Sequence, residues 1–137
     1  METSGVRRQR ISSGTPYETT VGYSRAVRVG SAVFVSGTTA LKDGALVGRD
    51  NAAAQTRQIL ATIAWALGEA GATLADVVRY RVYLTEIAVW PEVAAELARA
   101  FADVRPANTL VAVSALVDPA MLVEIEADAI VGSAPRP

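Results

Sequence analysis

Residues 122–131 read LVEIEADAIV, and the strict alternation of apolar and acidic side chains predicts a β-strand with two different faces. One face carries Val123, Ile125, Ala127 and Ala129, and the other carries Glu124, Glu126 and Asp128. Carboxylates two positions apart on a strand lie about 6.8 Å from each other, so the acidic row repels itself unless cations or a ligand compensate it. We therefore expect a sheet whose apolar face packs on a core and whose charged face needs partners.

A second strand is predicted in residues 76–85, DVVRYRVYLT, where one face carries Val78, Tyr80, Val82 and Leu84 and the other Val77, Arg79, Arg81 and Tyr83. Arg79 and Arg81 have the same spacing of two as the acidic row, so cross-strand ion pairs are the favoured interpretation of Glu124 and Asp128. Glu126 stands mid-strand between two apolar residues. For this residue, pairing and a role in a functional site both stay open.

Two helices are predicted from apolar residues at helical spacing. The first runs from a cap at 50–51 to a stop at Gly71, and the second starts at Pro91 and ends near Asp103. Three short strands are expected before them, at 9–12, 25–29 and 32–36, with a turn at 13–16 and a loop at 38–49. One more strand is expected at 108–116, which completes the order β-β-β-α-β-α-β-β.

This order predicts an α/β (α+β) fold, a two-layer sandwich in which a mixed six-stranded sheet carries two helices on one face. Right-handed crossovers place both helices on the same face. The other face would carry Val77, Leu110, Leu116 and Leu122, and self-association is the economical way to cover it. We expect one domain over residues 1–137, with flexible tails at 1–9 and 133–137.

The composition excludes several function classes. With no His and no Cys, the chain has no disulfide, no thiolate nucleophile, no Ser-His pair and no ordinary zinc site. No phosphate-binding glycine motif is present, so a nucleotide cofactor is not expected. Lys and Arg number 13 against 14 Asp and Glu, which leaves no basic stripe for nucleic acid, and Arg7, Arg8 and Arg10 fit a solvated chain end. Without a long apolar run, we expect a cytoplasmic protein that needs no cofactor, metal, nucleic acid or membrane.

Two groups of residues could form a binding site. Tyr17 and Tyr23 bracket a glycine turn, where a tyrosine either caps a pocket or covers the edge of a core. The segment Ser36-Gly37-Thr38-Thr39 follows an apolar strand and offers backbone N–H groups and hydroxyls, as small anion-binding nests do.

Five segments together resemble the RidA/YjgF family, also called L-PSP endoribonuclease-like. They are GYSRAVRVG (22–30), VFVSGTTA (33–40), LADVVRYRVYLT (74–85), RPANTLVAV (105–113) and LVEIEADAI (122–130). The resemblance extends from about Ile11 to Val131. It implies a chorismate-mutase-like fold, a homotrimer with ligand clefts between subunits, and hydrolysis of reactive enamines and imines to 2-keto acids and ammonia.

The resemblance also assigns roles to residues of this chain. It implies that Tyr23 orients the substrate, that Ser36 and Gly37 bind it, and that Glu126 is the general acid and base. Where deaminating members carry an arginine that clamps the substrate carboxylate, this chain has Asn108, followed by Thr109.

Because Asn108 carries no charge, losing that clamp costs about 1.5–3 kcal/mol, and we expect weak activity on 2-imino acids. Arg25 is a candidate replacement for the missing cation. A non-catalytic module that binds a small molecule in the same cleft is the alternative function.

Overall fold

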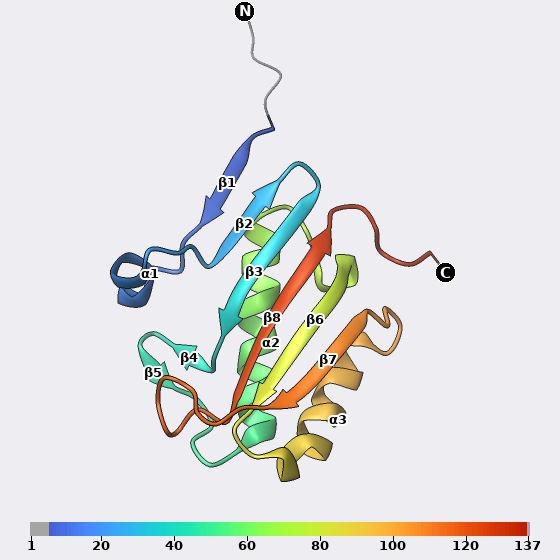
Figure 1. Cartoon of the computed structure of the whole chain (residues 1–137). Coiled ribbons are helices and arrows are strands. Elements are labelled where there is room, and N and C mark those ends of the chain that lie inside the picture. The colour runs from blue at the N-terminus through green and yellow to red at the C-terminus, as the bar shows by residue number, and fades with distance from the viewer. Residues whose placement is uncertain (1–5, 137) are drawn as a thin grey trace, which may run out of the picture.

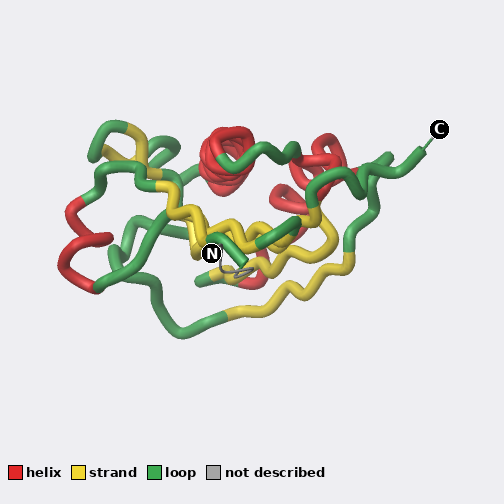
Figure 2. The backbone as a smooth tube through the Cα atoms, turned by 90° about the horizontal axis from the view of Figure 1, so that it is seen from above, coloured by secondary structure: helices red, strands yellow, loops and turns green. Residues whose placement is uncertain are grey.

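A mixed six-stranded sheet forms one layer of the structure, a computed structural model that describes residues 6–136. From edge to edge its strands are β1 (Arg8–Ile11), β2 (Ala26–Val29), β3 (Ala32–Thr38), β8 (Val123–Ile130), β6 (Val77–Leu84) and β7 (Ala107–Ala112). Only β6 and β7 are parallel neighbours within this sheet. Helices α2 (Ala52–Glu69) and α3 (Trp90–Phe101) cover one face (Figures 1 and 2), so the predicted two-layer arrangement is confirmed.

Strand β8 lies in the middle of the sheet and carries the core as its sequence predicts. Its apolar side chains Val123, Ile125, Ala127 and Ala129 are at most 1% exposed. They belong to the same buried cluster as the α2 side chains Ile59, Ile63 and Leu67. The helix begins as predicted, because the side chain of Asn51 accepts a hydrogen bond from the Ala54 N–H at 2.9 Å.

The two faces of β6 do not alternate as predicted. A register shift between Val77 and Arg79 reverses the alternation at the start of the strand, so Val77 is 2% exposed and Val78 is 42% exposed. Leu110 and Leu122 also pack against the core. Three of the four apolar residues predicted for the open face therefore lie on the core side, the fourth, Leu116, lies outside the strands, and Phe34 and Val111 are exposed instead.

Three short elements replace segments that were predicted as turn and loop. Helix α1 (Pro16–Val21) starts on a proline and ends at Gly22, whose φ of 89° suits a left-handed cap. Strands β4 (Leu41–Lys42) and β5 (Ala45–Leu46) form a separate hairpin. Its turn residues Asp43 and Gly44 have φ values of 51° and 81°, as a type I′ turn requires. Two 3-10 turns, η1 (Leu74–Asp76) and η2 (Ile87–Val89), complete the elements.

Parts of both predicted tails contact the rest of the fold. Arg8 and Gln9 pair with Val29 and Arg28 as the first residues of β1. Near the other end, the Ala134 N–H donates to Asp76 Oδ1 at 3.2 Å. Residues 1–5 and 137 of the predicted tails lie outside the described residues.

Strand β7 ends at Ala112, earlier than predicted.

Within residues 6–136, the helices are too short or too polar to cross a membrane.

Candidate functional site

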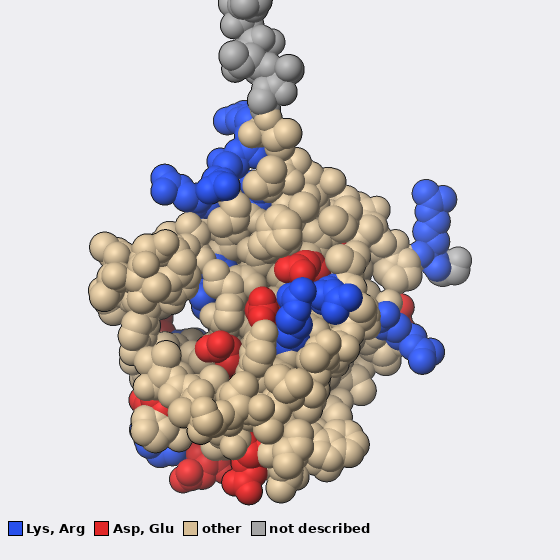
Figure 3. Space-filling model, viewed as in Figure 1, with Lys and Arg blue, Asp and Glu red and all other residues tan. Residues whose placement is uncertain are grey.

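A cavity of about 900 Å³ opens beside the end of β3. Its walls come from α1, the β4–β5 hairpin, α2 and the loop before β8, and Figure 3 shows the surface hollowed between α1 and the hairpin. The inner part of the wall is polar and consists of Arg25, Ser36, Gly37 and Glu124. The outer part is largely apolar and includes Tyr17, Val21, Tyr23, Leu41, Trp65 and Val117, and the buried Met121 also lines the cavity.

Glu124 is the acidic side chain of the inner wall, and Gly37 makes room for it. A Cβ added to residue 37 would lie 2.9 Å from Oε2 of Glu124, which is closer than real Cβ contacts. Burial raises the pKa of the Glu124 carboxyl, and the nearby Glu126 carboxylate raises it further, while the positive charge of Arg25 opposes them. The carboxyl therefore ionises less readily than an exposed glutamate and is suited to exchanging protons with a ligand.

Arg25 is the buried cation of the cavity, with 8% of its surface exposed. One guanidinium nitrogen donates to the Gly37 carbonyl at 2.9 Å, and the other donates to Thr38 Oγ1 at 3.3 Å. Its buried Nε has no hydrogen-bond partner among the described residues. The guanidinium carbon lies 5.6 Å from the centre of the Tyr23 ring, within reach of a cation–π interaction.

The hydroxyl groups near Arg25 hold the end of β3 in place. Ser36 Oγ donates to the Ser24 carbonyl at 2.6 Å, which ties β3 to the segment before β2. Tyr17 and Tyr23 border the cavity with 43% and 36% of their surface exposed, so both are accessible. Of the residues predicted for the site, the cavity thus brings together Tyr17, Tyr23, Arg25, Ser36 and Gly37.

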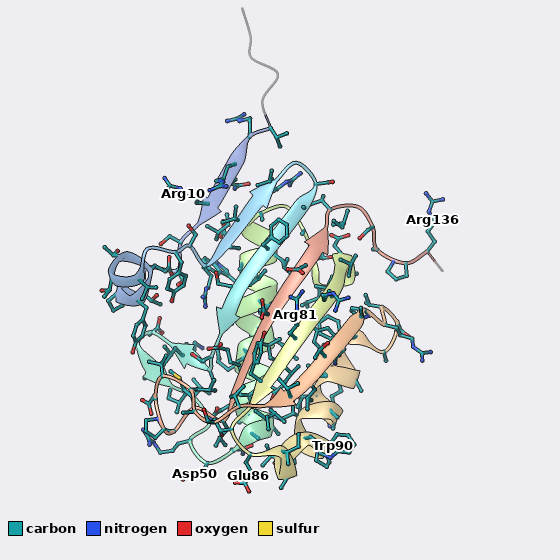
Figure 4. The ribbon with its side chains drawn as sticks, viewed as in Figure 1. Arg10, Asp50, Arg81, Glu86, Trp90 and Arg136 are labelled. Carbon is teal, nitrogen blue, oxygen red and sulfur yellow. The ribbon has the colours of Figure 1, made fainter. Side chains whose placement is uncertain are left out.

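Glu126 is not among the residues that line the cavity. Tyr83 donates its hydroxyl to Glu126 Oε1, and Arg81 lies 3.5 Å from Oε2. The same guanidinium lies 3.5 Å from Asp128, and Figure 4 shows Arg81 over the middle of the open sheet face. The predicted cross-strand pairing is therefore confirmed for Asp128 and extends to Glu126.

For Glu124 the predicted cross-strand ion pair is wrong, because its carboxyl lies against Gly37 in the cavity wall. The glycine at position 37 is the signal in the sequence that could have distinguished Glu124 from Glu126. A glycine on the adjacent strand lets a carboxylate approach the backbone closely, whereas a larger residue would force the Glu124 side chain to shift.

Asn108 and Thr109 lie on edge strand β7, away from this cavity. Asn108 is paired with Tyr80 and borders a second pocket of about 520 Å³, together with Trp90 and Phe101. Thr109 is paired with Arg81. Within one subunit, the structure therefore separates these two predicted site residues from the others.

Trp65 and Met121 are cavity residues that the sequence analysis missed. Trp65 lies on α2 outside the buried stripe of Ile59, Ile63 and Leu67, and 43% of its surface is exposed. A large aromatic residue on the polar side of a helix was the available signal. Residues 6–136 contain no group of three or more Asp, Glu, His or Cys arranged to hold a metal ion.

Comparison with known proteins gives a consistent family. The family described as Endoribonuclease L-PSP matches residues 14–131 of this chain. The 3-aminoacrylate deaminase RutC of Acinetobacter baylyi is 36% identical over 116 residues, which cover 84% of this chain and 90% of that protein. An uncharacterised protein of Streptomyces coelicolor is 35% identical over 125 residues, covering 91% of this chain and 93% of its own.

Solved structures share the same fold. The crystal structure of Rv2704 from Mycobacterium tuberculosis, described as a member of the YjgF/YER057c/UK114 family, has 53% sequence identity and a TM-score of 0.84. The match covers 91% of this chain and all of that one, 100%. PA3499 from Pseudomonas aeruginosa, a protein of unknown function, has 31% identity and a TM-score of 0.81, with 94% and 96% of the two chains covered.

Proposed function

This chain belongs to the Endoribonuclease L-PSP family, also called the RidA or YjgF family, and from that premise we propose that it is a cytoplasmic hydrolase that deaminates a small enamine or imine. The observation that carries the proposal is the Glu124 carboxyl, with its raised pKa, held against Gly37 in the cavity wall. The 3-aminoacrylate deaminase RutC supports the reaction class, because that relative acts on an enamine.

The proposed reaction needs proton transfer and no redox step. An enamine first takes a proton at carbon and becomes an iminium ion, the protonated form of the imine. Water then adds to the iminium carbon while Glu124 accepts one of its protons, and the same carboxyl returns that proton to nitrogen. The C–N bond breaks as the C=O bond forms, and the hydroxyl proton leaves with the ammonia. The products are a carbonyl compound and ammonia. This sequence requires a carboxyl that is protonated for part of the time, as a raised pKa favours.

The other cavity residues have binding roles in this proposal. Tyr23 borders the cavity beside Arg25 and orients the substrate. The backbone at Ser36 and Gly37 forms the floor next to Glu124. Glu126, to which the family resemblance assigned the acid-base role, is engaged by Tyr83 and Arg81, so the proposal gives that role to Glu124.

We further propose that the chain acts as a homotrimer with ligand clefts between subunits. The support is the open sheet face, which carries the exposed side chains of Phe34 and Val111 and no second layer of described residues (Figure 2). In such an assembly, Asn108 and Thr109 on edge strand β7 of one subunit would border the cavity of the next. The absence of an arginine at position 108 would then weaken activity on 2-imino acids relative to members that carry it.

The test compares two neighbouring carboxylates of β8. Imines are generated in situ from a panel of amino acids by an amino-acid oxidase, and hydrolysis is followed by competition with semicarbazide. We expect Glu124→Gln to slow hydrolysis roughly 100-fold, as loss of a general acid and base does. Glu126→Gln is the matched control on the same strand, and its hydrolysis rate should stay within about threefold of that of the unchanged protein. Glu126 is bonded to Tyr83 and Arg81 and does not line the cavity.

The reverse pattern, in which Glu126→Gln is inactive and Glu124→Gln is active, would contradict the assignment. Tight binding of a metabolite without turnover of any imine would instead support the non-catalytic binding module.

A further inference from the structure

The outer wall of the cavity exposes more apolar surface than hydrolysis of a small polar imine requires. Five large apolar or aromatic side chains with at least 36% of their surface exposed border this one opening: Tyr17, Val21, Tyr23, Trp65 and Val117. They come from α1, the segment before β2, α2 and the loop before β8. An apolar patch of this kind, bordered by polar groups, is typical of a ligand-binding surface.

The inner wall holds a cation that its protein partners leave incompletely satisfied. Arg25 donates to the Gly37 carbonyl and to Thr38 Oγ1, while its Nε is buried without a partner among the described residues. The other basic residue of the cavity, Lys42, is exposed on the hairpin beside Asp43. Because a buried guanidinium gains most from a charge-assisted bond, an anionic group of a ligand is best placed at Arg25.

We infer that the cavity takes a monocarboxylate with a bulky apolar side chain, its carboxylate held by Arg25 and its side chain packed on Trp65. Given the proposed function, the preferred substrates are carboxylate-bearing imines or enamines of bulky apolar amino acids. A cavity of about 900 Å³ leaves a three-carbon ligand with most of the apolar wall in contact with water. A larger side chain removes that surface from water and binds more tightly.

The position of Glu124 fits this ligand. Burial and the Glu126 carboxylate raise the pKa of the Glu124 carboxyl, whereas the positive charge of Arg25 lowers it. A ligand carboxylate beside Arg25 neutralises that field. Glu124 then holds its proton more firmly, in the form that donates to the leaving nitrogen.

Binding is measured without turnover, by calorimetry with three stable probes. They are 4-methylpentanoate, its neutral amide 4-methylpentanamide, and the short acid propanoate. We expect 4-methylpentanoate to bind at least tenfold more tightly than either of the others. Equal affinity for the acid and the amide, or for the long and the short acid, would overturn the inference.

Two substitutions assign the two halves of the ligand to their residues. Arg25→Gln should abolish the tenfold preference for the acid over the amide, and Arg25→Lys should keep part of it because the charge remains. Trp65→Ala should abolish the preference for the long acid while leaving propanoate unchanged. Arg25 also donates a hydrogen bond to β3, so the thermal unfolding of each variant is recorded as a control for folding. If Arg25→Gln does not fold, the acid-to-amide preference of Arg25→Lys is measured in its place.

Location is tested by fluorescence. The chain has two tryptophans, so a Trp90→Phe background leaves Trp65 as the single reporter in the cavity. Figure 4 shows Trp90 at the start of α3, and it borders the second pocket. We expect 4-methylpentanoate to change Trp65 emission. An unchanged emission spectrum at saturating ligand would overturn the assignment to this cavity.

The failure of this inference is distinguishable from failure of the proposed function. If 4-methylpentanoate binds through Arg25 and Trp65 but no imine is hydrolysed, the ligand class stands and the proposed hydrolase does not. If imines are hydrolysed but acids bind no better than amides, the hydrolase stands and the ligand class is wrong.

Discussion

At the scale of single residues, Glu124 is the β8 carboxylate that lines the cavity, where it lies against Gly37. A Cβ at this position would lie 2.9 Å from Oε2 of Glu124, so the Glu124 side chain would have to shift. Glu126, two residues further along β8, is engaged by Tyr83 and Arg81 on the open face. The two carboxylates therefore have different surroundings, one in the cavity wall and one in a cluster with Tyr83 and Arg81 on the open face.

The raised pKa of Glu124 predicts a pH-dependent effect on stability. A group with a folded-state pKa above its unfolded value favours folding fully below the unfolded pKa, near 4.5 for glutamate, and this contribution is lost as pH rises through the folded value. We therefore expect Glu124→Gln to raise Tm by roughly 1–3 °C at pH 7, with the gain disappearing toward pH 4. Thermal unfolding followed by circular dichroism measures both values.

Glu86→Gln is the control for this measurement, because Glu86 is exposed and its side chain makes no capping hydrogen bond to the turn it precedes. Its Tm difference from the unchanged protein should stay constant over the same pH range. A Glu124→Gln variant less stable than the unchanged protein at pH 7 would show that the ionised carboxylate is a net stabilising group.

The sequence could predict part of this site. Alternation in residues 122–131 gives the apolar and acidic faces of β8, and the motifs around Tyr23, Ser36 and Gly37 lead to the cavity wall. The alternation alone does not distinguish the three carboxylates, however, because it places all of them on the same face of the strand. Their difference arises from a register shift in β3 between Val35 and Thr38, which depends on the neighbouring strand.

At the scale of elements, α1 is the short helix that brings Tyr17 and Val21 to the cavity. It has six residues, too few to stabilise itself or to show a helical period. Its stability comes from Glu18, which accepts hydrogen bonds from the Ser13 N–H at 3.1 Å, from the Ser13 hydroxyl and from Thr15 Oγ1 at 3.2 Å. Burial opposes ionisation of Glu18, but these hydrogen bonds outweigh it and lower the pKa of its carboxyl.

We predict that Glu18→Ala loosens α1 without unfolding the protein. Hydrogen exchange at the amides of residues 17–21 should accelerate at least tenfold, since three hydrogen bonds to a charged acceptor are lost, while exchange in β8 stays unchanged. The same substitution should also lower the affinity for a cavity ligand, because α1 forms part of the cavity wall. Glu86→Ala, which removes an exposed carboxylate elsewhere, should leave the exchange of α1 as it is.

Equal exchange in α1 before and after the Glu18 substitution would show that the helix is held by its packing and its proline start.

The length of an element decides whether the sequence pattern can predict it. Helices α2 and α3, with 18 and 12 residues, have enough turns for periodicity to be visible. Helix α1 and the two-residue strands of the hairpin are specified by turn residues such as Pro16, Gly22 and the Asp43-Gly44 pair.

At the scale of the whole molecule, the open sheet face combines charge with exposed apolar side chains. Figure 3 shows acidic and basic side chains together in the middle of this face, where Arg81 lies 3.5 Å from both Glu126 and Asp128. Phe34, paired with Asp128 across the strands, is 49% exposed. A surface with internally paired charges and free apolar groups fits an interface better than it fits permanent contact with water.

The proposed trimer makes a direct prediction for this face. Light scattering of the unchanged protein should give three times the chain mass of 14.3 kDa. Phe34→Asp places a carboxylate beside Asp128, and burying two like charges in an interface is costly, so the variant should dissociate to a species of one chain mass. Ile87→Asp changes an equally exposed apolar residue on η2, outside the sheet, and should leave the mass unchanged.

Activity supplies the link between assembly and site. Asn108 on β7 does not border the cavity of its own subunit, so a role for it in that cavity requires a neighbouring copy. If the trimer forms the complete cleft, Phe34→Asp should lower imine hydrolysis at least tenfold, even though Phe34 is not a cavity residue. Under the same condition, Asn108→Arg should raise activity on 2-imino acids only in the assembled protein. A fully active single chain would contradict the inter-subunit cleft and confine the chemistry to the cavity beside β3.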